Sequence, residues 1–140
     1  MARVDRAEAL IRLAAAPTGH LATIRPDGRP HIVVVTFAAV GEIVVSAIDY
    51  KPKRTLDLQR LANIGANPMV SFLVDHYDPD WRDLWWVRVD GPASIHRSGE
   101  IWEGAIEALA AKYPQYTERR PEGPVIAISQ DQVTGWVSTK

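Results

Sequence analysis

Apolar residues recur at helical spacing near the N-terminus, over residues 4–16. Asp5 precedes the repeat and Glu8 follows three positions later, a spacing typical of a helical capping box. Pro17 and Gly19 then interrupt the pattern. The repeat predicts a helix with one apolar face. That face consists of Ala7, Leu10, Ile11 and Ala14.

Three segments rich in β-branched residues follow, over residues 20–25, 30–38 and 42–48. Asp27-Gly28 lies between the first two and is typical of a tight hairpin with positive φ values. Gly41 marks a turn before the third segment. The pattern predicts a three-stranded antiparallel meander.

The spacing of apolar residues changes at residues 52–67, where leucines no longer alternate with polar residues. This spacing predicts a helix packed on one side. Residues 69–75 predict a strand and residues 76–83 a polar loop. Residues 84–96 predict a long strand, with Gly91-Pro92 as a bulge or an edge bend.

The last third predicts a helix from an N-cap at Ser98 through Ala111, a loop over residues 112–123, and a final strand or strand pair over residues 125–137. About six strands and three helices result, and most strands follow one another without a helix between them. This order favours an α+β fold, an antiparallel barrel, as a single domain over residues 1–140.

Composition narrows the possible chemistry. The chain has 140 residues, 16 basic against 17 acidic side chains, and no cysteine. Thiolate metal sites and cysteine nucleophiles are therefore excluded, and a general nucleic-acid surface is not supported. No apolar run reaches the ~18 residues of a membrane span, and the N-terminus does not resemble a secretory signal. We expect a soluble, cytoplasmic protein that binds neither nucleic acid nor membrane.

The basic cluster Lys51, Lys53 and Arg54 opens the second predicted helix. Cations beside the free N–H groups of a helix N-terminus suit a phosphate or a carboxylate. The same run is also compatible with an ordinary solvated surface, so both interpretations stay open.

Two adjacent tryptophans begin the long strand. Alternation places Trp86 and Arg88 on one face, and Trp85 and Val87 on the other. A tryptophan beside an arginine suits a planar anionic ligand or a subunit interface, whereas core packing would explain the pair equally well.

Polar side chains are scattered over the early strands, at His31, Thr36 and Ser46. Alternation places His31 with Val33 and Val35, opposite to Ile32, Val34 and Thr36. Each of these polar groups could simply bond locally. The chain lacks nucleophile-elbow, dinucleotide and metal-ligand motifs, so an enzyme of this sequence would rely on a bound cofactor.

The sequence resembles the pyridoxamine 5'-phosphate oxidase-like split β-barrel family, and within it the actinobacterial branch that uses the deazaflavin F420. The resemblance covers residues 5–138. The matching segments are GHLATI (19–24), DGRPH (27–31), DYKPKR (49–54), NP (67–68), VDHY (74–77), DW (80–81) and WWVR (85–88).

The resemblance implies a six-stranded split barrel with peripheral helices, and a homodimer with a cofactor groove at the subunit interface. It implies that basic residues hold the cofactor phosphate and that an aromatic strand of the partner closes the groove. The implied cofactor-binding residues are His31, Ile32, Val33, Val34, Thr36, Ser46, Ala47, Ile48, Lys51, Lys53, Arg54, Trp85, Trp86 and Arg88. Because Val33–Val35 are apolar where family members can place polar residues, backbone groups would supply most hydrogen bonds to the ring.

The resemblance implies an oxidoreductase that transfers a hydride from reduced F420 to an unsaturated or conjugated acceptor. His31 is the candidate proton donor, since it titrates near neutral pH. Two alternatives stay open. One is an FMN-binding oxidase or flavin reductase on the same fold, and the other is a protein that binds a flavin or tetrapyrrole without catalysis.

Overall fold

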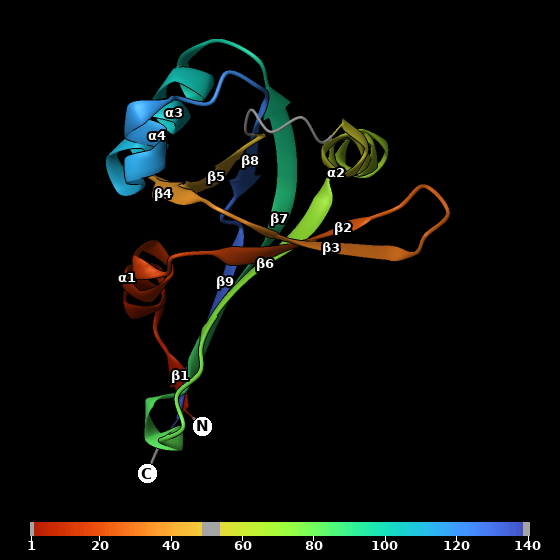
Figure 1. Cartoon of the computed structure of the whole chain (residues 1–140). Coiled ribbons are helices and arrows are strands. Elements are labelled where there is room, and N and C mark those ends of the chain that lie inside the picture. The colour runs from red at the N-terminus through yellow and green to blue at the C-terminus, as the bar shows by residue number, and fades with distance from the viewer. Residues whose placement is uncertain (1, 49–53, 139–140) are drawn as a thin grey trace.

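The computed structural model describes residues 2–48 and 54–138, and over residues 54–58 only the course of the backbone. Within these ranges the chain forms one antiparallel sheet, whose strands differ in length, with helices around it (Figure 1). In chain order the elements are β1 (Ala2–Val4), α1 (Arg6–Ala15), β2 (Gly19–Ile24), β3 (Pro30–Val35), β4 (Ala38–Val40), β5 (Ile43–Ala47), α2 (Arg54–Ala66), β6 (Met69–His76), η1 (Trp81–Asp83), β7 (Trp85–His96), α3 (Glu100–Lys112), α4 (Pro114–Glu118), β8 (Val125–Ser129) and β9 (Gln132–Val137).

All strand pairs are antiparallel, in the order β3-β2-β6-β7-β8-β5-β4, with β9 pairing β7 and β1 pairing β9. The α+β class and the antiparallel sheet predicted from sequence are confirmed. The expected number of strands is wrong, because the described residues form nine. The short strand β1 was missed since three residues carry no measurable alternation.

The long strand β7 joins the two parts of the sheet. Its first residues pair with β6 and β9, and after Pro92 its residues pair with β8. Gly91 lies at this change of partner, and a Cβ there would come within 2.2 Å of the Ser129 carbonyl oxygen. The bend predicted at Gly91-Pro92 is therefore where β7 passes from one set of neighbours to the other.

The segment predicted as one strand over 30–38 is divided into β3 and β4. Thr36 and Phe37 separate them, and the Phe37 N–H donates to the Tyr113 hydroxyl at 3.1 Å instead of to a neighbouring strand. The hairpin before β3 uses a positive φ at Gly28 alone, with the Gly28 N–H bonded to the Arg25 carbonyl. This geometry is a turn with a glycine bulge, so Asp27 needs no left-handed conformation.

Helix ends follow the prediction in part. Asp5 caps α1, accepting from the Glu8 N–H at 2.9 Å, but the Glu8 carboxylate pairs with Arg12 and does not close a capping box. Ser98 is not the N-cap of α3; Gly99, with φ of 95°, occupies that position. The predicted loop after α3 contains the short helix α4, and the final segment is a strand pair, β8 and β9.

The described residues form two apolar clusters in the core. The larger lies inside the barrel and includes the edge-to-face pair Phe37 and Phe72, with ring centroids 4.8 Å apart. The smaller lies between α3 and the strands β4, β5 and β8. Figure 1 shows α3 and α4 together over β4 and β5, with α2 standing separately above β2 and β3. The helices thus cover some sheet surfaces and leave others open.

Candidate functional site

The edge strand β3 presents two very different faces. His31 and Val35 are buried and Val33 is partly buried, whereas Ile32 and Val34 are 65% and 63% exposed. The alternation predicted from sequence is confirmed for residues 31–35, but not for Thr36, which lies beyond the end of β3 and does not continue the outward face. Among the described strands β3 pairs only with β2, so its outer backbone edge has no strand beside it. An exposed aliphatic edge strand is a surface that proteins normally cover.

The outward face continues across the sheet from β3. One row of paired residues crosses four strands: Val34 of β3 pairs with His20 of β2, His20 pairs with Leu73 of β6, and Leu73 pairs with Arg88 of β7. His20 is half-buried there, with Nδ1 at 3.3 Å from the Leu73 carbonyl oxygen and 4.0 Å from the Asp75 carboxylate. The face is thus aliphatic at β3 and becomes polar and aromatic toward β7.

A cluster of interacting side chains lies at the β7 end of this face. The guanidinium of Arg88 lies 5.6 Å from the centroid of the Trp86 ring and donates to the Asp90 carboxylate at 2.8 Å. Ser71 donates to the other oxygen of Asp90 at 2.5 Å. The Trp136 ring is 6.4 Å from that of Trp86. Because Asp90 and Trp86 both hold Arg88, its guanidinium has a fixed position on the sheet.

Trp85 points to the opposite side of β7, as alternation predicts. Its ring is stacked on His76 at 6.0 Å, and the Arg12 guanidinium lies 5.5 Å from its centroid. These three residues line a mainly polar pocket of about 370 Å³, together with Arg82 and Ser138. The structure therefore separates the two tryptophans: Trp86 belongs to the outward face, and Trp85 to a pocket between α1, the 76–84 segment and the end of β9.

His31 lies on the inner side of β3, near α2. Its Nδ1 is buried and has no hydrogen-bond partner. Burial lowers the pKa of His31, and the nearby positive charges of Arg25 and Arg60 lower it further. The lowered pKa keeps the His31 ring neutral at physiological pH, and Arg25 and Arg60 place positive charge near it. This arrangement disfavours a proton on His31 and favours an anion beside it.

The remaining predicted positions on β3 and β5 lie away from the outward face. Ser46 is 2% exposed and donates to the Thr36 carbonyl oxygen at 2.8 Å. The Thr36 hydroxyl lies 3.0 Å from the Tyr116 hydroxyl of α4. Ala47 packs in the smaller apolar cluster and Ile48 in the larger. The structure therefore uses these four residues in packing between sheet and helices, and does not bring them beside Ile32 and Val34.

The predicted basic cluster is described only in part. Lys51 and Lys53 lie outside the described residues, and Arg54 is the first residue of α2. Two further arginines, Arg25 and Arg60, lie near His31. Sequence analysis did not predict Arg25 as a site residue, because a single arginine on a hairpin belongs to no recognisable motif. In the described part of the chain, no His, Asp and Glu residues group in a way that could hold a metal ion. No helix in that part is long and apolar enough to cross a membrane.

Comparison with known protein families gives a match over nearly the whole chain. The family model for pyridoxamine 5'-phosphate oxidase matches residues 5–137. The chain belongs to this family. The split-barrel fold expected from the resemblance is thereby confirmed as a pyridoxamine 5'-phosphate oxidase-type fold.

Solved structures of this fold are similar over nearly the whole chain. A conserved hypothetical protein from Mycobacterium tuberculosis superposes with a TM-score of 0.77 at 23% identity, covering 96% of this chain and 85% of that one. An FAD-binding protein from Mesorhizobium loti gives 0.74 at 21% identity, covering 99% and 98%. A heme storage protein from Vibrio cholerae gives 0.72 at 18% identity, covering 94% and 93%. No curated protein matches the chain.

Within the oxidase-type fold, three of the surfaces formed by the described residues suit a ligand or a partner by their chemistry. The outward face of β3, with its open backbone edge, suits a planar apolar body. The inner region of Arg25, Arg60 and His31 suits an anionic group, since the buried Nδ1 has no partner. The Trp86 and Arg88 cluster suits a π-system or a second protein surface.

Proposed function

We propose that this protein is an F420-dependent oxidoreductase that works as a homodimer, with one cofactor groove at each end of the subunit interface. The observation that carries the proposal is the edge strand β3, whose Ile32 and Val34 are exposed beside an unpaired backbone edge. A second subunit and a planar cofactor would together remove this apolar surface from water.

The β3 edge suits a deazaflavin or flavin ring for a specific reason. The outward side chains Ile32 and Val34 are aliphatic and offer the ring a flat apolar contact. The ring's pyrimidine portion needs hydrogen-bond donors and acceptors, and valine side chains have none. The open edge of β3 supplies backbone N–H and C=O groups in their place.

The anionic part of the cofactor is expected near α2. Arg25 and Arg60 supply positive charge there, and His31 Nδ1 is a buried group without a partner. By the family resemblance Lys51, Lys53 and Arg54 would add the phosphate contacts at the start of α2. F420 also carries an acidic tail, and this many cations around one helix suits such a ligand.

Reduced F420, when bound, supplies a hydride to an unsaturated or conjugated acceptor. The chain's own contribution is to orient the acceptor and to exclude water, which is where positioning lowers the barrier. Trp86 and Arg88 of the partner subunit would cover the open side of the groove, with Arg88 held by Asp90. His31 is neutral and faces inward, so the proton is expected from solvent.

The test is a fluorescence titration of the apoprotein with F420 and, separately, with FMN, FAD and heme, using the tryptophans as reporters. We expect F420 to bind most tightly, with binding weakened about tenfold or more in Arg25→Gln. Arg29→Gln is the matched control, because Arg29 lies in the same hairpin but pairs with Asp27 at the surface. Tighter binding of FMN or FAD would assign the protein to the flavin-dependent alternative.

Turnover distinguishes an enzyme from a binding protein. Reduced F420 is mixed with the protein and a quinone, a nitroaromatic or a bilin, and oxidation of the cofactor is followed by its absorbance. Acceptor-dependent oxidation is expected. Tight binding with no oxidation for any acceptor class would instead support a protein that sequesters a flavin or tetrapyrrole, and binding of none of the four ligands would contradict the cofactor assignment altogether.

A further inference from the structure

The inner face of the β2–β3 hairpin and α2 together place two arginines around His31. His31 of β3 lies directly opposite Thr23 of β2, and Asn63 of α2 donates to the Thr23 hydroxyl at 2.9 Å. This hydrogen bond holds α2 over the paired residues. Arg60 lies one helical turn before Asn63, and Arg25 lies two residues beyond Thr23, so both belong to the same side of their elements. Both arginines are near enough for their charges to act on the His31 ring.

Nothing beside His31 stabilises a proton on its ring. The side chain is 9% exposed, and its Nδ1 has no hydrogen-bond partner. Burial lowers the pKa of His31, and the charges of Arg25 and Arg60 lower it further. The carboxylate of the hairpin, Asp27, is paired with Arg29 at the surface. The charged groups described around His31 therefore repel a proton, and a negative charge among them would remove this repulsion.

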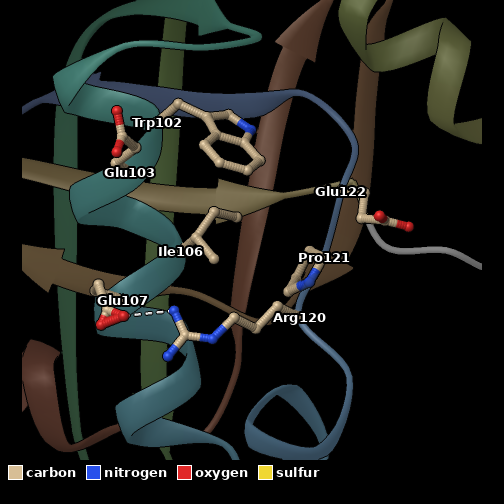
Figure 2. Close-up of a pocket in the computed structure, with 7 residues that line it drawn as sticks. All are labelled: Trp102, Glu103, Ile106, Glu107, Arg120, Pro121 and Glu122. Carbon is tan, nitrogen blue, oxygen red and sulfur yellow. Dashed lines mark hydrogen bonds and ion pairs between the residues drawn. The ribbon is translucent and has the colours of Figure 1, made fainter.

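Arg25 is also available to a ligand, unlike most of the arginines whose contacts are described. Five of these each form an ion pair with a carboxylate: Arg12, Arg29, Arg82, Arg88 and Arg120. Figure 2 shows one example, in which the Arg120 guanidinium is turned toward Glu107 of α3. Arg25 forms no such pair with a described residue. Its positive charge is thus not offset by a carboxylate and can attract an anion.

We propose that an anion bound among Arg25, Arg60 and His31 is bound together with one proton, which His31 takes up from solvent. This rests on the function proposed above, because the anion is the acidic part of the cofactor. The bound negative charge offsets the two guanidinium groups, so the imidazolium becomes stable beside them. Because His31 faces inward, this proton stabilises the bound anion and takes no part in the reaction.

The coupling acts in both directions. If the anion favours the proton, the proton favours the anion by the same free energy. The pKa of His31 should therefore be higher in the complex than in the free protein. Between these two pKa values, affinity for the anion should rise as the pH decreases, and outside this window His31 contributes no pH dependence.

The experiment uses sulfate as the probe because, unlike phosphate, it does not titrate near neutral pH. The ring C–H groups of the four histidines are followed by proton–carbon correlation NMR as the pH is changed. Titrations are run with sulfate and with chloride at equal ionic strength. The His31 resonance is the one missing from His31→Gln, and variants of the other three histidines identify it by elimination if that protein does not fold.

With saturating sulfate we expect the pKa of His31 to rise by roughly one unit, as is usual for an opposite charge close by. The titration curves of the other three histidines should not move. A rise of this size corresponds to an increase in sulfate affinity of up to about tenfold toward acid pH. Arg25→Gln should reduce both the shift and the affinity. Arg29→Gln is the matched control and should behave as the wild type, because Arg29 is already paired with Asp27.

A His31 titration that is the same in sulfate and in chloride would overturn the proposal, as would a sulfate affinity that does not depend on pH. Both outcomes can be told apart from failure of the proposed function. If F420 binds but sulfate leaves His31 unchanged, the cofactor assignment stands and the proton link is wrong. If sulfate raises the pKa of His31 but F420 does not bind, the site takes an anion with a proton and the cofactor assignment is wrong.

Discussion

Asn63 of α2 donates a hydrogen bond from Nδ2 to the Thr23 hydroxyl of β2 at 2.9 Å, and both residues are almost fully buried. Gln59 adds a second hydrogen bond to this network by donating to Asn63 Oδ1 at 2.7 Å. Because a buried amide must keep its partners, this link fixes where α2 stands on the sheet. The helix in turn carries Arg60 near His31, so the geometry of the proposed anion site depends on it.

Removing Asn63 should therefore destabilise the fold. We expect Asn63→Ala to lower the free energy of unfolding by about 1–3 kcal/mol, since the Thr23 hydroxyl loses its donor and a small cavity forms. Urea unfolding measures the change. Gln59→Ala is the control, because Gln59 is only partly buried and its loss should cost less. In a double-mutant cycle, additive effects of Asn63→Ala and Thr23→Val would contradict a direct interaction.

The outward face of β3 should control the oligomeric state. We expect Ile32→Glu to convert the proposed dimer to monomer, because a carboxylate in an apolar interface would be buried without a partner. Light scattering during size-exclusion chromatography gives the mass. Ile11→Glu is the matched control, since Ile11 on α1 is 72% exposed and lies on another surface. If both variants keep the wild-type mass, the β3 face is not the interface.

His31 should make the protein less stable in acid. Its pKa is lowered in the folded protein, chiefly by burial, from an ordinary value of 6.5. Below 6.5 the unfolded chain binds a proton at this position before the folded chain does, so stability is complete above 6.5 and falls as the pH decreases. We expect the slope of unfolding free energy against pH in this window to be smaller in His31→Gln. An unchanged slope would mean that His31 takes up its proton equally in both states.

Lys112 should make the free energy of unfolding depend on pH in the alkaline range. Its ammonium donates to the Ala16 carbonyl oxygen at 2.8 Å and lies 3.7 Å from the Phe37 ring centroid. The ring contact favours the charged form, but burial outweighs it and lowers the pKa of Lys112 from 10.5 to about 8. Between these values the unfolded chain binds more protons, so the folded state gains stability as the pH rises.

The comparison with Lys112→Met isolates this effect. Methionine keeps the apolar stem beside Phe37 and cannot titrate. From about pH 8 to about pH 9.5 we expect the unfolding free energy of the wild type to rise relative to that of the variant. The measurement stops there because burial raises the pKa of Tyr113, which acts in the opposite sense at higher pH. A constant difference across the range would show that Lys112 is not desolvated in the folded state.

The sequence by itself determined the local patterns. The alternation on β3 separates His31 from Ile32, and that on β7 separates Trp85 from Trp86, because successive side chains of any strand point to opposite faces. The motifs also indicated the oxidase-type family, and the family model covers the same stretch of chain. These properties depend on neighbours within a few residues, so they are readable without knowing the fold.

Only the tertiary structure decided which of these faces is buried and which side chains meet. The division of the predicted strand 30–38 follows from the Tyr113 hydroxyl bonding to Phe37, 76 residues away. The Thr36 hydroxyl lies beside the Tyr116 hydroxyl, and Ser46 donates to the Thr36 carbonyl oxygen, so neither side chain belongs to the outward face. Trp102 of α3 is held against the segment after α4 because its indole N–H donates to the Gly123 carbonyl oxygen, 21 residues away. Contacts between distant segments depend on how strands pair and helices pack, and no local pattern of residue types specifies them.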